Sequence, residues 1–157
     1  MPRESYSGHL EGPVLVSSCL LGIPCRYNGQ HKVCPDILQT PGIIPIPVCP
    51  EQMGGLSTPR NPAHFIGGDG RSVLSGNASV VDTSGVDVTR YFIAGARATV
   101  MIATLLDVKW AILKEDSPSC GTHLVYISGS LVRGVGVAAA LLYDMGVCLM
   151  NENKEIL

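Results

Sequence analysis

Short apolar runs alternate with longer stretches of helical periodicity along this chain. The runs with the length and β-branched content of buried strands cover residues 14–18, 43–48, 110–113 and 147–150. Apolar side chains at helical spacing predict helices over residues 31–39, 87–106 and 135–145. Within the second run, Pro45 and Pro47 each remove a backbone donor, so that strand is expected to be short, irregular or at a sheet edge.

Strands that alternate with helices favour a parallel sheet that is covered on both faces. We therefore predict an α/β fold with a Rossmann-like, mainly parallel sheet and helices on both faces. A single domain is expected over residues 13–157, after a flexible leader at 1–12. Residues 56–86 are rich in glycine, serine and proline, and we interpret them as a loop or hairpin excursion with a short strand at 79–82.

Composition narrows the possible function classes. The chain has 157 residues, of which 46% are hydrophobic and 15% charged, whereas disordered chains are poor in apolar residues. The formal net charge of -2 provides no global basic field for nucleic acid. No apolar run has the length of a membrane span, and the polar start lacks a signal-peptide pattern. We expect a cytoplasmic protein whose six cysteines are free, metal-bound or catalytic.

Three of the cysteines follow predicted strands. Cys19 comes after the first strand, Cys49 after the second, and Cys120 lies in the loop after the third. Open α/β sheets bind ligands beyond the carboxyl ends of their strands, so these thiols should meet at one sheet edge. Cys34 and Cys148 have no such placement, and we interpret both as packing residues, with Cys148 in the core of the last strand.

The number of converging thiols bears on the kind of metal. Structural zinc usually takes four protein ligands, often in Cys-x-x-Cys pairs, and that spacing does not occur here. A 4Fe–4S cluster normally takes four thiolates, and three leave one iron open as a Lewis acid. Cys25 is a fourth candidate ligand, which would close the cluster and make the site structural or electron-transferring.

The same loops carry other groups of chemical interest. Glu51 lies two residues after Cys49, which is close enough for a general acid or base beside a metal. Ser117 and Ser119 share the loop of Cys120 and can donate hydrogen bonds. The loop histidines, which show no regular spacing and are interpreted as surface residues, are His31, His64 and His123.

Eight motifs in this order resemble the thiouracil desulfidase family. They are VLVSSCLLG (14–22), CRYNG (25–29), PVCPE (47–51), GGL (54–56), GGDG (67–70), DVT (87–89), LKEDSPSCG (113–121) and GVGVAAALL (134–142). The resemblance extends from about Val14 to Glu152. It implies a 4Fe–4S cluster on Cys19, Cys49 and Cys120, and non-redox hydrolysis of the thiocarbonyl of a thiopyrimidine.

The resemblance also assigns roles to the other loop residues. Glu51 matches the position of the family's acid–base glutamate, and Ser117 matches that of its assisting serine. We expect Cys25 and Ser119 on the substrate side of the same pocket, with Cys25 close to the cluster and not among its ligands. The expected partner is a small thiopyrimidine such as thiouracil, and no membrane is expected.

Two alternatives remain open at this point. One keeps the cluster and changes the substrate to thiouridine in a nucleotide or in tRNA, which requires a basic, aromatic rim. The residues able to supply such a rim are Arg26, Tyr27, Arg60 and Arg71. The other is a non-enzymatic Fe–S or metal-binding protein with four cysteine ligands and no open position. The number of ligands distinguishes this second alternative from an enzyme.

Overall fold

A computed structural model of the chain describes residues 10–157. Residues 1–9 of the expected leader at 1–12 therefore lie outside the described residues, and Gly12 is already part of the first strand. None of the described helices is long and apolar enough to cross a membrane.

The first sheet contains the four strands that the sequence predicts as buried. Its strands are β1 (Gly12–Ser17), β2 (Ile43–Val48), β5 (Trp110–Leu113) and β8 (Cys148–Asn151). They pair in the order β2-β1-β5-β8, and every pair is parallel, which confirms the predicted parallel sheet. Strand β2 lies at the edge, where Pro45 and Pro47, two residues apart, both turn their missing N–H groups away from β1.

A second, mixed sheet was not predicted. Its strands are β3 (Ala63–Ile66), β4 (Ser79–Asp82), β6 (Leu124–Ile127) and β7 (Ser130–Arg133). They pair in the order β4-β3-β6-β7, with β3 parallel to β6 and the outer pairs antiparallel. The segment 56–86 thus supplies half of this sheet, and a hairpin supplies the rest. The hairpin turns at Ser128 and Gly129, whose positive φ values of 48° and 84° suit a two-residue turn.

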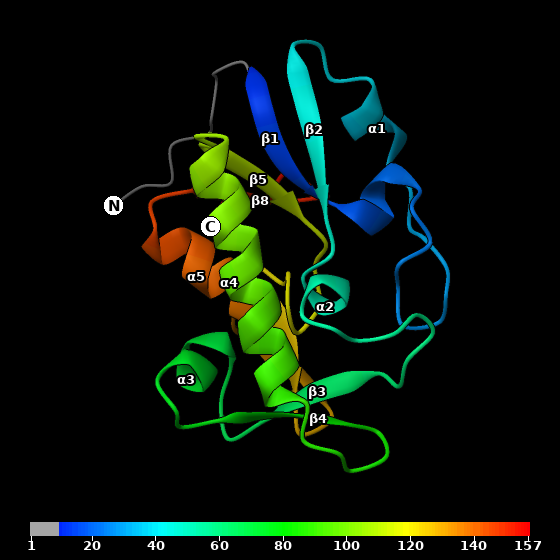
Figure 1. Ribbon diagram of the computed structural model, residues 1–157, viewed down its shortest axis with the longest axis vertical. Helices are drawn as coiled ribbons and strands as arrows, with labels where there is room; N and C mark the ends of the chain where they lie inside the picture. Colours follow the sequence, from blue (N-terminus) through cyan, green and yellow to red (C-terminus); the bar gives the residue numbers. More distant parts are fainter. Residues whose placement is uncertain (1–9) are drawn as a thin grey trace.

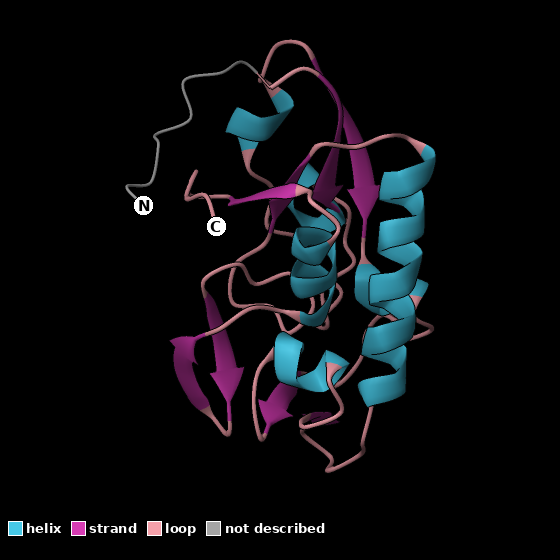
Figure 2. Ribbon diagram, turned by 90° about the vertical axis from the view of Figure 1, so that its left-hand side faces the viewer, coloured by secondary structure: helices cyan, strands magenta, loops and turns pink. Residues whose placement is uncertain are grey.

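Helices connect and cover the two sheets. They are η1 (Ser18–Leu21, a 3-10 turn), α1 (Pro35–Leu38), α2 (Pro50–Met53), α3 (Gly70–Leu74), α4 (Thr89–Leu105) and α5 (Val137–Asp144). The long helix α4 runs past both sheets, which lie at opposite ends of the molecule (Figures 1 and 2). Phe92 and Ala96 of α4 pack in the core of the second sheet, whereas Ala103 packs in that of the first. This helix therefore joins the two cores.

The other face of the first sheet is covered by the chain that follows β1. Leu20 of η1 and Ile37 of α1 pack on Val14 and Val16, and the buried Cys19 and Cys25 belong to the same cluster. Burial of such aliphatic side chains contributes roughly 1.5–3 kcal/mol each, so this small layer is a stable platform. Helices on both faces of the parallel sheet agree with the predicted architecture.

The two cysteines assigned to packing behave differently. Cys34 is half-buried at the start of α1 and packs against the layer on β1. Cys148 was expected in the core, but it is exposed. It is the first residue of β8, which is an edge strand, so its side chain lies where that strand is not yet covered.

Helix α2 is held against α4 by backbone contact. A Cβ atom on Gly95 would come within 1.8 Å of the Pro50 carbonyl oxygen, and one on Gly54 within 2.0 Å of the Tyr91 carbonyl oxygen. Only glycine at both positions allows the two helices to approach this closely. The contact fixes the position of α2, which carries Glu51.

Candidate functional site

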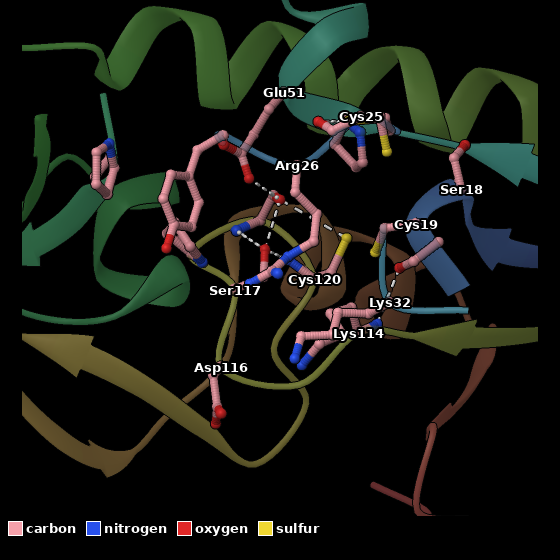
Figure 3. A pocket seen from close by; sticks show the side chains of 18 of the residues that line it. Ser18, Cys19, Cys25, Arg26, Lys32, Glu51, Lys114, Asp116, Ser117 and Cys120 are labelled. Carbon is pink, nitrogen blue, oxygen red and sulfur yellow. Dashed lines mark hydrogen bonds between the residues drawn. The ribbon is translucent and has the colours of Figure 1, made fainter. Parts of the chain in front are cut away.

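A cavity of about 550 Å³ opens beyond the carboxyl ends of β1, β2 and β5. Its lining includes all seven side chains singled out in the sequence, which are Cys19, Cys25, Cys49, Glu51, Ser117, Ser119 and Cys120. Pro62, Ala63 and Tyr126 from the region of the second sheet also contribute. The cavity therefore lies between the two sheets, and loops far apart in the sequence meet in it (Figure 3).

Each strand of this group delivers one thiol. Cys19 lies in η1, directly after β1, and Cys49 precedes the first turn of α2, directly after β2. Cys120 follows β5 in a loop whose Ser117 carbonyl accepts a hydrogen bond from Gly121 N at 2.8 Å. Cys25 belongs to the loop between η1 and α1, and its sulfur points into the same space as those of Cys19 and Cys120 (Figure 3).

The thiols perturb one another. A hydrogen bond with Cys19, together with burial, raises the pKa of Cys25 to about 11, although a contact with Cys49 opposes this shift. The hydrogen bond with Cys25 and burial raise the pKa of Cys49 well above its usual range. Burial raises the pKa of Cys120 to about 12, against the lowering effect of hydrogen bonds with Ser17 and Ser119. Without a cation, these groups therefore stay protonated at neutral pH.

This donor set fits an iron–sulfur cluster. Several converging buried thiols are compensated as thiolates by a cationic metal centre, because the thiolate is the form that binds metal. Around one zinc ion with Zn–S bonds of about 2.3 Å, sulfurs would lie roughly 3.8 Å apart. Among the described residues, no three cysteine sulfurs lie within 4.8 Å of one another. The described cysteines are therefore not preformed for a single ion bound by three thiolates.

Glu51 lies between a cation and a hydroxyl. Its Oε1 atom is 3.0 Å from Arg60 Nε, and both side chains are largely buried. Its Oε2 atom accepts a hydrogen bond of 2.9 Å from Ser119 Oγ. The sequence predicted the location of Glu51 beside the thiols, but it indicated Arg60 only as part of a basic rim. No periodic pattern marks Arg60, which reaches the site from an irregular segment.

The two serines form a directed chain of hydrogen bonds. Ser117 Oγ accepts the backbone N–H groups of Ser119 at 3.2 Å and Cys120 at 3.1 Å. The hydroxyls of Ser117 and Ser119 are 2.9 Å apart. Ser119 has one proton, and Glu51 Oε2 at 2.9 Å is a nearer acceptor for it than Cys120 Sγ at 3.7 Å. With that proton on Glu51, Ser117 donates to Ser119. Ser119 therefore contacts the carboxylate directly, and Ser117 acts through it.

The loop of Cys120 is anchored by the buried carboxylate of Glu115. The sequence did not indicate this role. Glu115 Oε1 accepts the N–H groups of Thr122, His123 and Leu124 at 2.9–3.0 Å. Its Oε2 accepts Asn151 Nδ2 at 2.7 Å. Burial raises the pKa of Glu115, but these hydrogen bonds outweigh that effect and lower it to about 2. His123, expected at the surface, is largely buried because its ring packs beside Glu115 and Thr122.

Basic residues also border the cavity. Arg26, Lys32 and Lys114 are part of its lining, and the Arg26 guanidinium lies 5.6 Å from the centre of the Tyr27 ring. Lys114 Nζ is held 2.8 Å from Glu152 Oε1. Arg71, named as a candidate for the basic rim, is absent from the described lining and pairs with Asp144 on the surface.

Comparison with known proteins agrees with this geometry. A family model described as 2-thiouracil desulfurase matches residues 14–154. A protein of Bacillus subtilis (strain 168), described as uncharacterized protein YbbK, is 46% identical over 145 residues, covering 90% of this chain and 96% of that protein. A solved structure described as the [4Fe-4S]-dependent thiouracil desulfidase TudS is similar with a TM-score of 0.77. Its sequence is 37% identical, over 91% of this chain and 92% of that one.

The family match covers nearly the whole chain, and it includes every loop that lines the cavity. The structural match covers 91% of this chain, so it is not confined to either of the two sheets. This chain belongs to the 2-thiouracil desulfurase family.

Proposed function

We propose that this protein is a desulfidase that removes sulfur hydrolytically from a thiolated pyrimidine such as thiouracil, with a 4Fe–4S cluster. The observation that carries the proposal is a Glu51 carboxylate held on both oxygens at the edge of a cavity into which cysteines from three strand ends converge. A general base beside a thiol-lined cavity suits attack of water on a carbon that is bonded to sulfur.

Three cysteines are assigned as ligands and one is left out. Cys19 and Cys49 directly follow β1 and β2, and Cys120 lies in the loop after β5 that Glu115 anchors, so the sheet and this loop together set their separation. Cys25 lies in a longer loop and faces the same space. With three protein ligands, the bound cluster supplies an open iron, a Lewis acid with affinity for the thiocarbonyl sulfur.

Glu51 is the residue that binds the attacking water and accepts its proton. An ionised carboxylate can accept about four hydrogen bonds, and Glu51 has accepted one on each oxygen, from Arg60 and Ser119. The remaining positions can hold a water molecule and take its proton as the oxygen attacks the thiocarbonyl carbon. Ser119 keeps the carboxylate in place, and Ser117 completes the hydrogen bonding of Ser119. The cavity walls orient a planar pyrimidine for this attack.

The overall reaction balances without an electron carrier. Water supplies the oxygen that replaces sulfur on the ring carbon, and the carbon–sulfur bond breaks. Sulfur leaves with its electron pair as hydrosulfide, and the proton taken by Glu51 is returned to the products. Neither an oxidant nor a reductant is consumed, so the enzyme class is a hydrolase that acts on a carbon–sulfur bond.

A thiolated nucleotide is the second candidate substrate. Arg26 and Lys32 line the same cavity, and their charges would suit a phosphate more than a neutral base. A tRNA substrate would need a wider basic surface, and Arg71 lies apart from the cavity in an ion pair with Asp144. Turnover of free thiouracil compared with turnover of a thiolated uridine monophosphate distinguishes the two substrates.

The first test is an assay of the reconstituted protein under anaerobic conditions. We expect about four iron and four sulfide per chain, as set by one 4Fe–4S cluster. The loaded protein should convert thiouracil to uracil with release of one hydrosulfide. Protein without the cluster serves as the control and should release none. A fully loaded protein that turns over neither thiouracil nor the nucleotide would refute the proposed function and favour a non-enzymatic iron–sulfur protein.

A further inference from the structure

Arg60 links three segments of the site through its side chain. Its Nε atom lies 3.0 Å from Glu51 Oε1, and its Nη2 atom donates to the Cys25 carbonyl oxygen at 3.0 Å. Its Nη1 atom donates to Thr58 Oγ1 at 3.1 Å and to the Ser57 carbonyl oxygen at 3.3 Å. The side chain is only 8% exposed. One guanidinium therefore connects α2, the Cys25 loop and its own turn.

The backbone of Arg60 strengthens this connection. Its N–H group donates to the carbonyl oxygen of Tyr27 at 2.8 Å, so the residue is fixed to the Cys25 loop at both ends. The Cys25 carbonyl that accepts the guanidinium also lies 3.9 Å from Cys49 Sγ. Through Arg60, the position of the Glu51 carboxylate is thus coupled to the positions of two of the thiols.

Stability alone does not explain this arrangement. A largely buried ion pair loses in desolvation much of what it gains in attraction, so it is weak evidence of a stabilising role. The planar guanidinium does provide directional hydrogen bonds that a flexible ammonium cannot. Together with Ser119 on the opposite oxygen, it fixes the plane of the Glu51 carboxylate.

We propose that Arg60 is a positioning residue for the hydrolysis, which orients the Glu51 carboxylate toward the cavity. The inference rests on the proposed function and adds a residue to it. Four of the five N–H donors of Arg60 already bond to protein acceptors, one from Nε, two from Nη1 and one from Nη2. Arg60 is therefore committed to the protein and is not free to hold a phosphate of tRNA.

The test uses the cluster-loaded Arg60→Ala variant, with chemical replacement of the missing group. We expect iron content close to that of the wild type and a lower midpoint of thermal unfolding, because the Glu51 carboxylate loses its buried partner. The kcat for thiouracil should fall by about 10²-fold, as for a misplaced catalytic group, and KM should change by less than about threefold. Low millimolar guanidinium should restore kcat by about tenfold because it fits the vacated site, whereas methylammonium should not.

Arg71→Ala is the matched control. Arg71 pairs with Asp144 at 2.9 Å on the surface, with both side chains about half exposed. Its removal should leave iron content, kcat and the response to guanidinium as in the wild type. A general effect of guanidinium on the enzyme would appear equally in this control.

Several outcomes would overturn the proposal. One is a kcat of the Arg60→Ala variant within about twofold of the wild type. Another is a rise in KM with kcat unchanged. The third is a loss of iron from this variant that guanidinium does not reverse. If that variant does not fold, Arg60→Lys replaces it, since lysine keeps the charge and lacks the planar fork. The lysine variant should lose kcat at unchanged iron content, and a wild-type kcat would refute positioning by the fork. Wild-type protein that is inactive on every thiolated pyrimidine instead refutes the proposed function.

Discussion

The carboxylates of Glu115 and Glu51, both in the cavity lining, differ in how many hydrogen bonds they accept. Glu115 accepts hydrogen bonds on both oxygens from several backbone and side-chain groups, so it has no capacity left for a ligand. Glu51 meets one donor on each oxygen, and therefore keeps positions that water can occupy. The same functional group thus serves as a structural anchor at one residue and as a candidate base at the other.

Replacement of Glu51 by glutamine tests the proposed base. Glu51→Gln keeps the shape of the side chain but removes the group that takes a proton from water. We expect unchanged iron content and a loss of turnover of about 10²-fold or more. The measurement is the anaerobic release of hydrosulfide from thiouracil, with the exposed Glu11→Gln as the control. Near wild-type turnover by the loaded Gln variant would make Glu51 a structural loop residue.

The assignment of ligands among the cysteines is tested by serine substitutions. Cys25→Ser should keep most of the iron, because Cys25 is assigned to the pocket wall. Cys49→Ser should lose the cluster, because a hydroxyl is a poor ligand for iron compared with a thiolate. Cys148→Ser is the control, since that thiol is exposed outside the described cavity lining. Loss of iron in Cys25→Ser would point to four ligands, or to a different set of three.

At the scale of elements, the loop between β5 and β6 owes its shape to a buried charge. Glu115 at the start of the loop accepts the N–H groups of Thr122 and Leu124 at its end. Asn151 of β8 donates to the same carboxylate, so the loop is also tied to the edge of the first sheet. The position of Cys120 is therefore set by both neighbouring strands.

This anchor predicts a loss of stability in acid. The pKa of Glu115 is lowered from 4.5 to about 2 by hydrogen bonds that outweigh burial. Because the folded-state pKa is the lower one, its contribution is complete above about pH 4.5 and is lost as the pH falls toward 2. That contribution is on the order of 3 kcal/mol. Urea unfolding of the cluster-free protein between pH 7 and pH 3 should show this decline.

The variant Glu115→Gln isolates the effect. In the variant, the amide nitrogen of the glutamine would face N–H groups that donate to a carboxylate oxygen in the wild type. The free energy of unfolding of the variant at pH 7 should therefore fall by about as much as the Glu115 carboxylate contributes. Its stability should also change less between pH 7 and pH 3 than that of the wild type. The exposed Glu11→Gln again provides the control and should retain the wild-type pH dependence. Equal pH dependence in Glu115→Gln and the wild type would contradict this account.

The sequence predicts best those elements whose pattern of apolar side chains follows directly from their burial. The run 110–113 is a strand with the predicted bounds, and the periodic segment 87–106 contains α4, because continuous or periodic apolar residues reflect burial directly. Helix α2 was missed because four residues are too short for a period. The β6–β7 hairpin was missed although a Ser-Gly pair between two apolar runs is a signal for a two-residue turn.

At the scale of the whole molecule, the sequence located the site and missed the second sheet, which adds Pro62, Ala63 and Tyr126 to its walls. The rule that ligands bind beyond the ends of parallel strands brought Cys19, Cys49 and Cys120 to one edge, and all three line the cavity. The second sheet pairs β3 with β6, about 60 residues further along the chain, and no local pattern encodes that contact. Arg60 was placed only at the rim for the same reason, since its partners belong to other segments.

The order of strands in the first sheet has a consequence for biosynthesis. Strands β1 and β2 leave the ribosome early and can pair at once, but β5 and β8 complete the sheet only about 60 to 100 residues later. At about 5–20 residues per second, Cys120 follows Cys49 by roughly 4 to 14 seconds, and Asn151 of its anchor by roughly 5 to 20 seconds. During that interval the early cysteines have no completed cavity around them. We therefore expect insertion of the cluster to follow translation of β8, when the cavity around the three thiols is complete.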